Sequence, residues 1–142
     1  GALIENGDVS EAARLLGHPF RVTGRVVHGK TLGRKMGLPT LNIDFGDGDI
    51  VPRSGIYVSR CVSDGKTYRA VTNIGSRPTV DDGGTVNCET HIIDFDGDIY
   101  GETVSVELLL RIRDEKKFGS VEELKEAIEG DVKSAREYFE KN

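Results

Sequence analysis

Residues 103–112 read TVSVELLLRI, and this stretch indicates the fold class more clearly than any other in the chain. Its apolar side chains recur at every second residue from Val104 to Ile112, with mostly polar residues between them. Successive side chains of a β-strand point to opposite faces, so the alternation predicts a strand with one buried face. Four other segments show similar patterns and are predicted as strands: residues 20–28, 55–62, 67–74 and 86–95.

The segments between these strands contain turn and helix signals. Asp64-Gly65 separates two predicted strands and is typical of a tight hairpin turn. A helix is predicted from Ser120 to about Lys141, with Ser120 and Glu123 as a capping box. Its apolar stripe consists of Val121, Leu124, Ala127 and Ile128, followed by Val132, Ala135 and Phe139, and Gly130 is expected to kink or divide it. A short lead-in helix is predicted between Asp8, as its cap, and Gly17.

These elements predict a mainly β protein. We expect about six antiparallel strands in a closed barrel of the Greek-key type, with the C-terminal helix packed alongside. A length of 142 residues suits one domain. The 19 basic and 24 acidic side chains give a net charge of −5, which argues against a general nucleic-acid binder. No run approaches the roughly 18 apolar residues of a membrane span, so no contact with a membrane is predicted. Two cysteines suit a reducing compartment, and we expect the cytoplasm.

The most unusual stretch is residues 29–42, GKTLGRKMGLPTLN, in which glycines recur at every fourth position. Such glycines allow a backbone to approach a ligand closely, and the three basic residues of the stretch would suit a phosphate. Thr40 and Asn42 lie two residues apart, so an extended segment places both side chains on one face. Hydroxyl and amide oxygens are suitable ligands for Mg²⁺ held jointly with nucleotide phosphates. A surface hairpin with turn glycines explains the same composition equally well.

Three other motifs match known sites by their letters alone. Residues 24–31 fit the P-loop pattern G-x-x-x-x-G-K-[ST], but a P-loop must open a helix, and the residues that follow contain further glycines and a proline. Asp94-x-Asp96-x-Asp98 resembles the start of a calcium loop but lacks its glycine and its last acidic ligand. Cys88 and His91 have a zinc-ligand spacing, but residues three apart on one strand point to opposite faces.

Glu89 lies within a predicted strand among apolar neighbours. Partial removal from water would raise the pKa of this carboxyl toward that of a useful general base. An exposed glutamate on the solvent face of the strand is the alternative interpretation.

Taken together, six motifs in order resemble the riboflavin kinase family. They are Gly29-x₃-Gly33-Arg34-x₂-Gly37-x-Pro39-Thr40-x-Asn42, Gly55-Ile56-Tyr57, Asn73-Ile74-Gly75-x-Arg77-Pro78-Thr79, Glu89-Thr90-His91-Ile92, Tyr100-Gly101-Glu102 and Arg113-x₂-Lys116-x-Phe118. The resemblance extends from about Phe20 to the C-terminus and is close to the kinase module of bacterial bifunctional riboflavin kinase/FMN adenylyltransferases. It implies a connector at residues 1–18 and a kinase barrel at residues 19–142. An adenylyltransferase module would precede the connector, so FAD formation is not expected of this chain.

The resemblance also implies an activity and a site. The reaction would transfer the γ-phosphoryl group of ATP to the 5′-hydroxyl of riboflavin, giving ADP and FMN, with Glu89 as the base. The implied nucleotide-binding residues are Gly29, Gly33, Arg34, Gly37, Thr40, Ile92, Asp94 and Tyr100. Thr40 and Asn42 would hold Mg²⁺, and Arg113, Lys116 and Phe118 would bind the flavin. The alternatives are a barrel that binds flavin or FMN without chemistry and an oligonucleotide-binding barrel, which the acidic charge disfavours.

Overall fold

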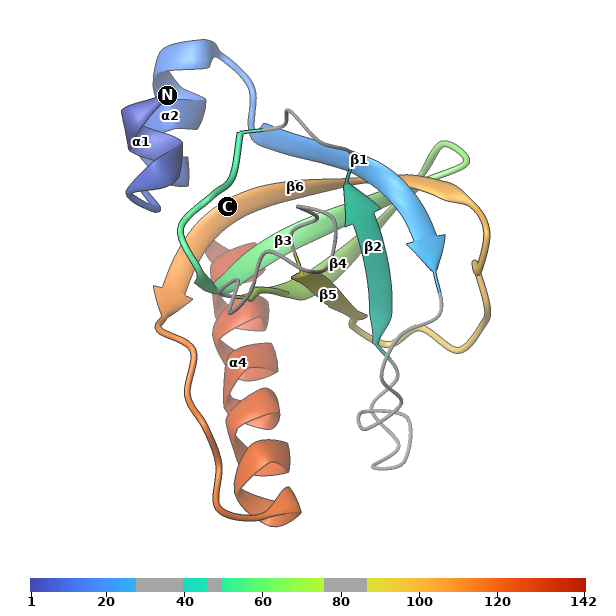
Figure 1. The fold of residues 1–142 in the computed structure, drawn as a ribbon. Coiled ribbons are helices and arrows are strands. Elements are labelled where there is room, and N and C mark those ends of the chain that lie inside the picture. The colour runs from blue at the N-terminus through green and yellow to red at the C-terminus, as the bar shows by residue number, and fades with distance from the viewer. Residues whose placement is uncertain (28–39, 46–49, 76–86) are drawn as a thin grey trace, which may run out of the picture.

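The computed structural model of the chain describes residues 1–27, 40–45, 50–75 and 87–142. Its strands form a closed barrel, with a pair of short helices at one end and a long helix against one side (Figure 1). The helices are α1 (Ala2–Glu5), α2 (Val9–Leu16) and α4 (Val121–Lys141). The strands are β1 (Phe20–Val27), β2 (Leu41–Phe45), β3 (Gly55–Ser63), β4 (Lys66–Ile74), β5 (Asn87–Ile92) and β6 (Thr103–Arg113).

The strands follow one another around the barrel in the order β1-β2-β5-β4-β3-β6, and β6 pairs with β1 to close it. Every pair is antiparallel. The predicted fold class is therefore confirmed. The turn between β3 and β4 is also confirmed, because Asp64 and Gly65 both have positive φ, as a two-residue type I′ hairpin turn requires.

The inside of the barrel is the main hydrophobic core. It is built from the inward-pointing residues of the strands, among them Val22, Ile43, Tyr57, Ile74 and Val106. The N-terminal helices contribute Ile4, Val9 and Ala12 to the same cluster, so residues before the barrel are part of its core. A chain of buried hydroxyl groups crosses the interior, from Ser59 to Thr72 at 2.8 Å and from Thr72 to Thr90 at 2.9 Å.

A second core lies on the outside of the barrel, beneath α4. Ala135 and Phe139 of the helix pack on residues that point outward from the strands, including Val58 and Val71. The predicted apolar stripe is confirmed in this C-terminal half of α4. Its N-terminal half projects beyond the barrel (Figure 1). There Val121 is exposed, while Leu124 and Ile128 are only partly buried, so this half is not covered by the core as predicted.

Strand β6 does not keep the simple alternation that its sequence predicts. Val58 pairs with Leu110 and Ser59 with Leu108, so Leu109 is an extra residue in the ladder. Such a β-bulge turns the following side chains relative to the sheet. Leu109 is therefore buried under α4 at 6% exposure, whereas Leu110, predicted to be buried, is 37% exposed.

Other boundaries also differ from the predictions. Strand β2 was not among the segments that the alternation identified. Strand β5 ends at Ile92 rather than at residue 95, because the backbone turns at Asp94, which has a φ of +59°. Helix α4 continues through Gly130, so this residue does not divide the helix, which was one of the two predicted outcomes. Among the described residues, no atom lies within 4 Å of a Cβ added at this position. Asp8 is the N-cap residue of α2, as predicted, but its side chain makes no capping hydrogen bond.

Gly24 is required where β1 meets β2. A Cβ atom at this position would lie 2.3 Å from the carbonyl oxygen of Asp44, which is its neighbour's backbone. The absence of a side chain lets the two strands approach closely. Gly24 is thus a packing residue of the barrel and not the first residue of a P-loop.

Candidate functional site

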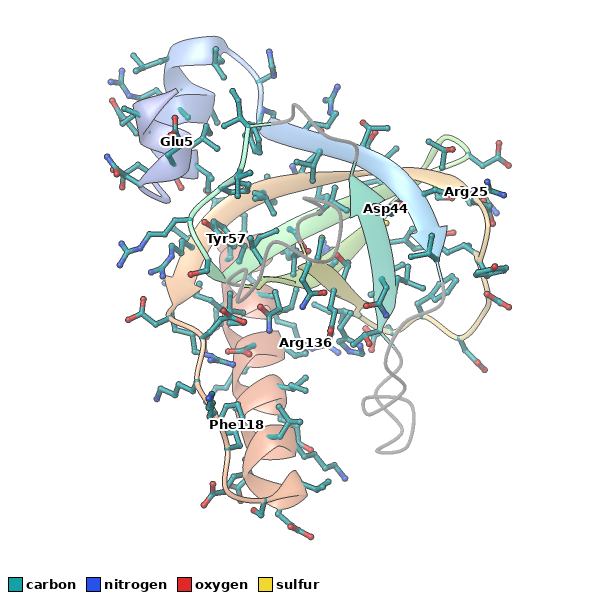
Figure 2. The ribbon with its side chains drawn as sticks, viewed as in Figure 1. Glu5, Arg25, Asp44, Tyr57, Phe118 and Arg136 are labelled. Atoms are coloured by element: carbon teal, nitrogen blue, oxygen red, sulfur yellow. The ribbon has the colours of Figure 1, made fainter. Side chains whose placement is uncertain are left out.

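A cavity of about 280 Å³ lies between the outer face of the sheet and the projecting half of α4. Its floor is formed by β3, β4 and β5, and its wall by α4 and the segment that joins β6 to it. Phe118 lies on this segment, beside α4 (Figure 2). The described lining residues are Thr40, Ile56, Val71, Asn73, Glu89, His91, Arg113, Lys116, Phe118, Leu124, Ile128 and Asp131. The cavity thus combines apolar walls with a few polar groups, as small-molecule sites generally do.

The polar groups on the floor come from one row of paired residues that runs across five strands. Asn42 of β2 pairs with Glu89 of β5, and Glu89 pairs in turn with Asn73 of β4. Asn73 pairs with Ile56 of β3, which pairs with Arg113 of β6. Residues directly opposite one another share a face, with Cβ atoms about 4.5–5.5 Å apart. The row therefore sets an amide, a carboxylate, a second amide, an apolar side chain and a guanidinium side by side.

Glu89 lies in the middle of this arrangement and is half-buried. Its strand neighbours Cys88 and Thr90 point into the barrel and are fully buried, which places Glu89 on the outer face by the alternation of the strand. The carboxylate is therefore partly removed from water, as predicted, and faces the cavity on one side.

Thr40 and Asn42 stand at the edge of the cavity next to Glu89. Thr40 directly precedes β2 and lines the cavity, and Asn42 is the partner of Glu89 in the ladder. Ile43 points into the core, so Asn42 points outward. Two neutral oxygen donors fit a Mg²⁺ ion only if phosphate oxygens and water complete its shell. In the described part of the chain, no three His, Cys, Asp or Glu side chains converge on a possible metal position.

Arg113 is held by a buried carboxylate on α4. Its Nε and Nη2 atoms donate to the two carboxylate oxygens of Asp131, both at 2.7 Å. The Asp131 side chain is 7% exposed and that of Arg113 22%. The guanidinium also lies 5.9 Å from the centre of the Phe118 ring. Such two-pronged pairs fix the direction of the guanidinium, so the position of α4 sets the position of Arg113.

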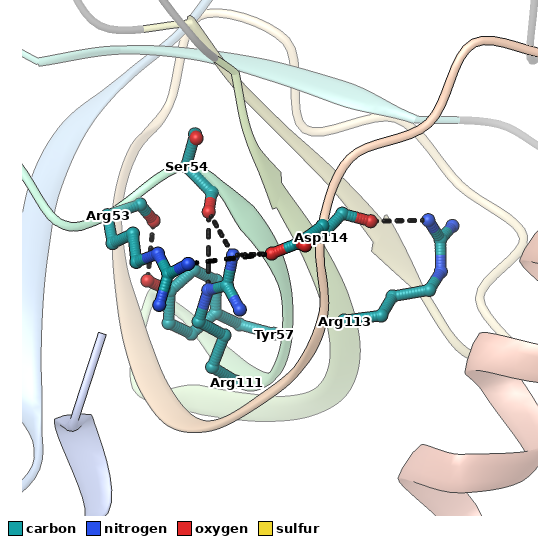
Figure 3. A network of polar contacts seen from close by, with 6 residues as sticks. All are labelled: Arg53, Ser54, Tyr57, Arg111, Arg113 and Asp114. Atoms are coloured by element: carbon teal, nitrogen blue, oxygen red, sulfur yellow. Dashed lines mark hydrogen bonds and ion pairs between the residues drawn. The ribbon is translucent and has the colours of Figure 1, made fainter. Parts of the chain in front are cut away.

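A second arginine braces the end of β6 next to the site (Figure 3). Arg111 donates to the carbonyl oxygen of Ser54 at 2.7 Å and to Asp114 at 2.6 Å. This hydrogen bond lowers the pKa of the Asp114 carboxyl. Beside it, the Tyr57 hydroxyl donates to the carbonyl oxygen of Arg53 at 2.6 Å, and burial raises the pKa of Tyr57. The bond from Arg111 to Ser54 ties the end of β6 to the residue that precedes β3.

The structure brings together most of the predicted site residues that it describes. Thr40, Glu89, Arg113, Lys116 and Phe118 all line the cavity, and Asn42 lies beside them in the ladder. The predicted nucleotide residues Gly29, Gly33, Arg34 and Gly37 lie outside the described residues.

Three predicted nucleotide-binding residues are not among the described lining of this cavity. Ile92 points into the barrel core, with 3% exposure. Asp94 forms a two-pronged ion pair with Arg136 of α4, at 2.9 and 3.0 Å, and this hydrogen bonding lowers the pKa of Asp94. Tyr100 is exposed, and its backbone N–H donates to Asp98.

The cavity also contains residues that the sequence analysis did not assign to the site. Asn73 and His91 fall within quoted motifs, but no role was predicted for either. Leu124 and Ile128 were predicted as core residues, and Asp131 was not singled out. A signal for Asp131 exists in the sequence, because an acidic residue among the apolar positions of α4 indicates a specific partner.

The arrangement of Cys88 and His91 confirms that they do not form a zinc site. Cys88 points into the barrel, whereas His91 lines the cavity on the outer face. Burial raises the pKa of Cys88 to about 12 and that of Cys61 to about 11. Both thiols are free and buried.

Comparison with known proteins identifies the family. The family model described as flavokinase, riboflavin kinase, matches residues 16–139. The chain belongs to the riboflavin kinase family. A bifunctional riboflavin kinase/FMN adenylyltransferase of Pseudomonas fluorescens is 43% identical over 129 residues, which are 91% of this chain and 41% of that protein. The family member described here therefore spans less than half the length of the curated relatives it matches, 44% in the case of the Bacillus subtilis enzyme.

Solved structures agree on the fold. The riboflavin kinase of Trypanosoma brucei superimposes with a TM-score of 0.61 and 26% identity, covering 87% of this chain and 81% of that one. A Streptococcus pneumoniae chain described as a macrolide-efflux protein gives a TM-score of 0.89 and 41% identity, covering 95% of this chain and 44% of that one. In the described ranges of this riboflavin kinase family member, no helix is both long and apolar enough to cross a membrane.

Proposed function

We propose that this chain is an ATP-dependent riboflavin kinase that transfers the γ-phosphoryl group of ATP to the 5′-hydroxyl of riboflavin. The observation that carries the proposal is the row of paired residues on the cavity floor. It sets Asn42, Glu89 and Arg113 in one line across the sheet. A flavin-binding module without chemistry needs the apolar slot but has no use for a carboxylate and an oxygen pair beside it.

The flavin ring would lie at the Arg113 end of the row. Phe118, Leu124 and Ile128 supply apolar surface there, and the fixed guanidinium of Arg113 supplies a directed donor. Lys116 lines the same end and adds a second positive charge. The terminal hydroxyl of the ribityl chain would then reach Glu89, three strands away from Arg113 along the row.

Glu89 would act as the general base. Its carboxylate accepts the proton of the 5′-hydroxyl as that oxygen forms its bond to the γ-phosphorus, while the bond from the γ-phosphorus to the bridging oxygen of ADP breaks. Proton transfer of this kind contributes typically about 10²–10⁴ in rate. Positioning and charge balance supply most of the remainder in phosphoryl transfer.

Thr40 and Asn42 are the residues that would hold Mg²⁺, together with the phosphates of ATP. The ion, when bound, neutralises the charge that develops on the transferred group. Thr40 lines the cavity next to Glu89, so the two side chains would bring the phosphate and the hydroxyl to one place. We place the enzyme in the cytoplasm, as the two free buried thiols suggest. The first 18 residues would connect it to an adenylyltransferase module.

A turnover assay tests the proposal. The chain is incubated with riboflavin, ATP and Mg²⁺, and FMN and FAD are separated by chromatography. We expect FMN and no FAD. Bound riboflavin without FMN would instead favour a flavin-binding module. If the chain neither binds riboflavin nor forms FMN, the assignment is overturned.

A pair of matched variants tests the role of Glu89. Glu89→Gln should keep riboflavin and nucleotide binding and lose about 10²-fold or more in kcat. Asp44→Asn makes the same carboxylate-to-amide change at an exposed position of the neighbouring strand β2, outside the described cavity lining, and should leave kcat unchanged. Equal kcat values for Glu89→Gln and the unmodified protein would show that Glu89 is not the base.

A further inference from the structure

Asn73 has a buried side-chain oxygen for which the described residues provide no donor. The residue lies on β4, and its side chain lines the cavity. Throughout the described part of the chain, no group donates a hydrogen bond to its Oδ1 atom, which is shielded from solvent. A carbonyl oxygen can only accept hydrogen bonds, and buried polar atoms normally have partners. An unsatisfied acceptor inside a cavity therefore indicates a ligand that brings a donor.

The position of Asn73 narrows down that donor. Asn73 pairs with Glu89 on one side and with Ile56 on the other, and Ile56 pairs with Arg113. Neighbouring positions of such a row are about 4.5–5.5 Å apart. The argument rests on the proposed function, in which the 5′-hydroxyl lies at Glu89 and the flavin ring at Arg113. The chain that joins them then passes Asn73, and in riboflavin this chain carries secondary hydroxyl groups.

We propose that Asn73 accepts a hydrogen bond from a secondary hydroxyl of the ribityl chain and thereby selects flavins with a polyhydroxylated side chain. A flavin whose chain lacks these hydroxyls would leave Oδ1 buried without a donor. Sites built to bond a substrate hydroxyl reject analogues without it for this reason. Asn73 is thus a residue that determines specificity, beside the base but not part of the proton transfer.

The test compares two substrates on two proteins. Riboflavin is compared with 10-(5-hydroxypentyl)isoalloxazine carrying the same ring methyl groups, which keeps the terminal hydroxyl and lacks the secondary ones. The unmodified chain should prefer riboflavin. Asn73→Leu should lose about tenfold or more in kcat/KM for riboflavin and change by less than about twofold for the hydroxypentyl analogue. Asn87→Leu makes the same change on β5 at an exposed position outside the described cavity lining, and should keep the preference of the unmodified chain.

Thermal unfolding separates a specificity role from a structural one. Leucine has nearly the shape of asparagine and no acceptor, so Asn73→Leu without ligand should unfold at the same temperature or higher. Riboflavin should raise the unfolding temperature of this variant less than that of the unmodified chain. Equal losses of kcat/KM for both flavins, or an unchanged preference for riboflavin, would overturn the proposal.

The same measurements distinguish the inference from the proposed function. If the unmodified chain forms no FMN, the kinase assignment fails. The shifts in unfolding temperature produced by riboflavin and by the analogue still report on Asn73 in that case. A larger shift with riboflavin that disappears in Asn73→Leu supports the contact, and equal shifts in the two proteins overturn it.

Discussion

The pair of Arg113 and Asp131 joins α4 to the barrel, and Asp131→Asn should destabilise the protein strongly. Both carboxylate oxygens of Asp131 accept bonds of 2.7 Å, and its side chain is 7% exposed. Removing one partner of a buried ion pair costs about 3–5 kcal/mol, because the remaining charge loses its compensation. Arg113 is 22% exposed and also donates to the carbonyl oxygen of Asp114 at 3.0 Å, so water and this bond compensate part of the loss. We therefore expect a decrease of about 2–3 kcal/mol in the free energy of unfolding.

For a domain of this size, that decrease corresponds to a fall of roughly 5–10 °C in the unfolding temperature. Urea unfolding at pH 7, followed by circular dichroism, measures the free energy directly. A rise in the KM for riboflavin should accompany the loss if the flavin ring binds at Arg113 as proposed, because Arg113 is then no longer held in one direction.

The chain provides a matched control in the pair of Asp94 and Arg136. This pair also joins α4 to the barrel through two bonds, of 2.9 and 3.0 Å, but its side chains are 72% and 48% exposed. Exposed pairs contribute little, because water solvates the separated charges almost as well. Asp94→Asn should not change stability measurably. If Asp131→Asn cost no more than Asp94→Asn, the argument from burial would be refuted.

Three further outcomes are expected. Burial raises the pKa of Cys61 to about 11 and of Cys88 to about 12, so above about pH 9 the unfolded chain loses thiol protons that the folded chain keeps. Stability should therefore fall as the pH rises from about 9 to about 12, and urea midpoints of a double Cys→Ala variant should fall less. Gly24→Ala should cost more than about 2 kcal/mol in urea unfolding, because the new Cβ meets the Asp44 backbone; a smaller cost would show that β1 and β2 can move apart. Thr40→Ala should raise the KM for MgATP more than that for riboflavin in steady-state assays, and the opposite order would contradict its metal role.

Much of the fold was predictable because its signals are local. Residues two apart on a strand lie on one face, so the alternation in β1 and in the first half of β6 predicted their buried sides correctly. The Asp64-Gly65 turn needs positive φ at both residues, which few other sequences tolerate. The predicted cap of α4 is also present, since Ser120 accepts a hydrogen bond from the backbone of Glu123.

The bulge in β6 was not predictable in the same way. Leu108, Leu109 and Leu110 are alike in hydrophobicity, so no pattern shows which of them is the extra residue in the ladder. The choice depends on α4, which covers Leu109 from outside while the barrel interior holds Leu108. Leu124 and Ile128, which line the cavity, were wrongly predicted as core residues for a related reason. Periodicity shows that a helix face is apolar but not whether the chain or a ligand covers it.

For the site, the sequence by itself determined the residue types and their order, and its motifs were specific enough to indicate the family. Only the tertiary structure decided which of these residues face one another. Asn42, Asn73 and Glu89 come from three different strands and meet because antiparallel pairing sets them in one row. Asp131 reaches Arg113 because α4 packs across the outside of the same sheet. Strand register and helix packing depend on the whole core at once, and this is the physical reason that no local pattern contained them.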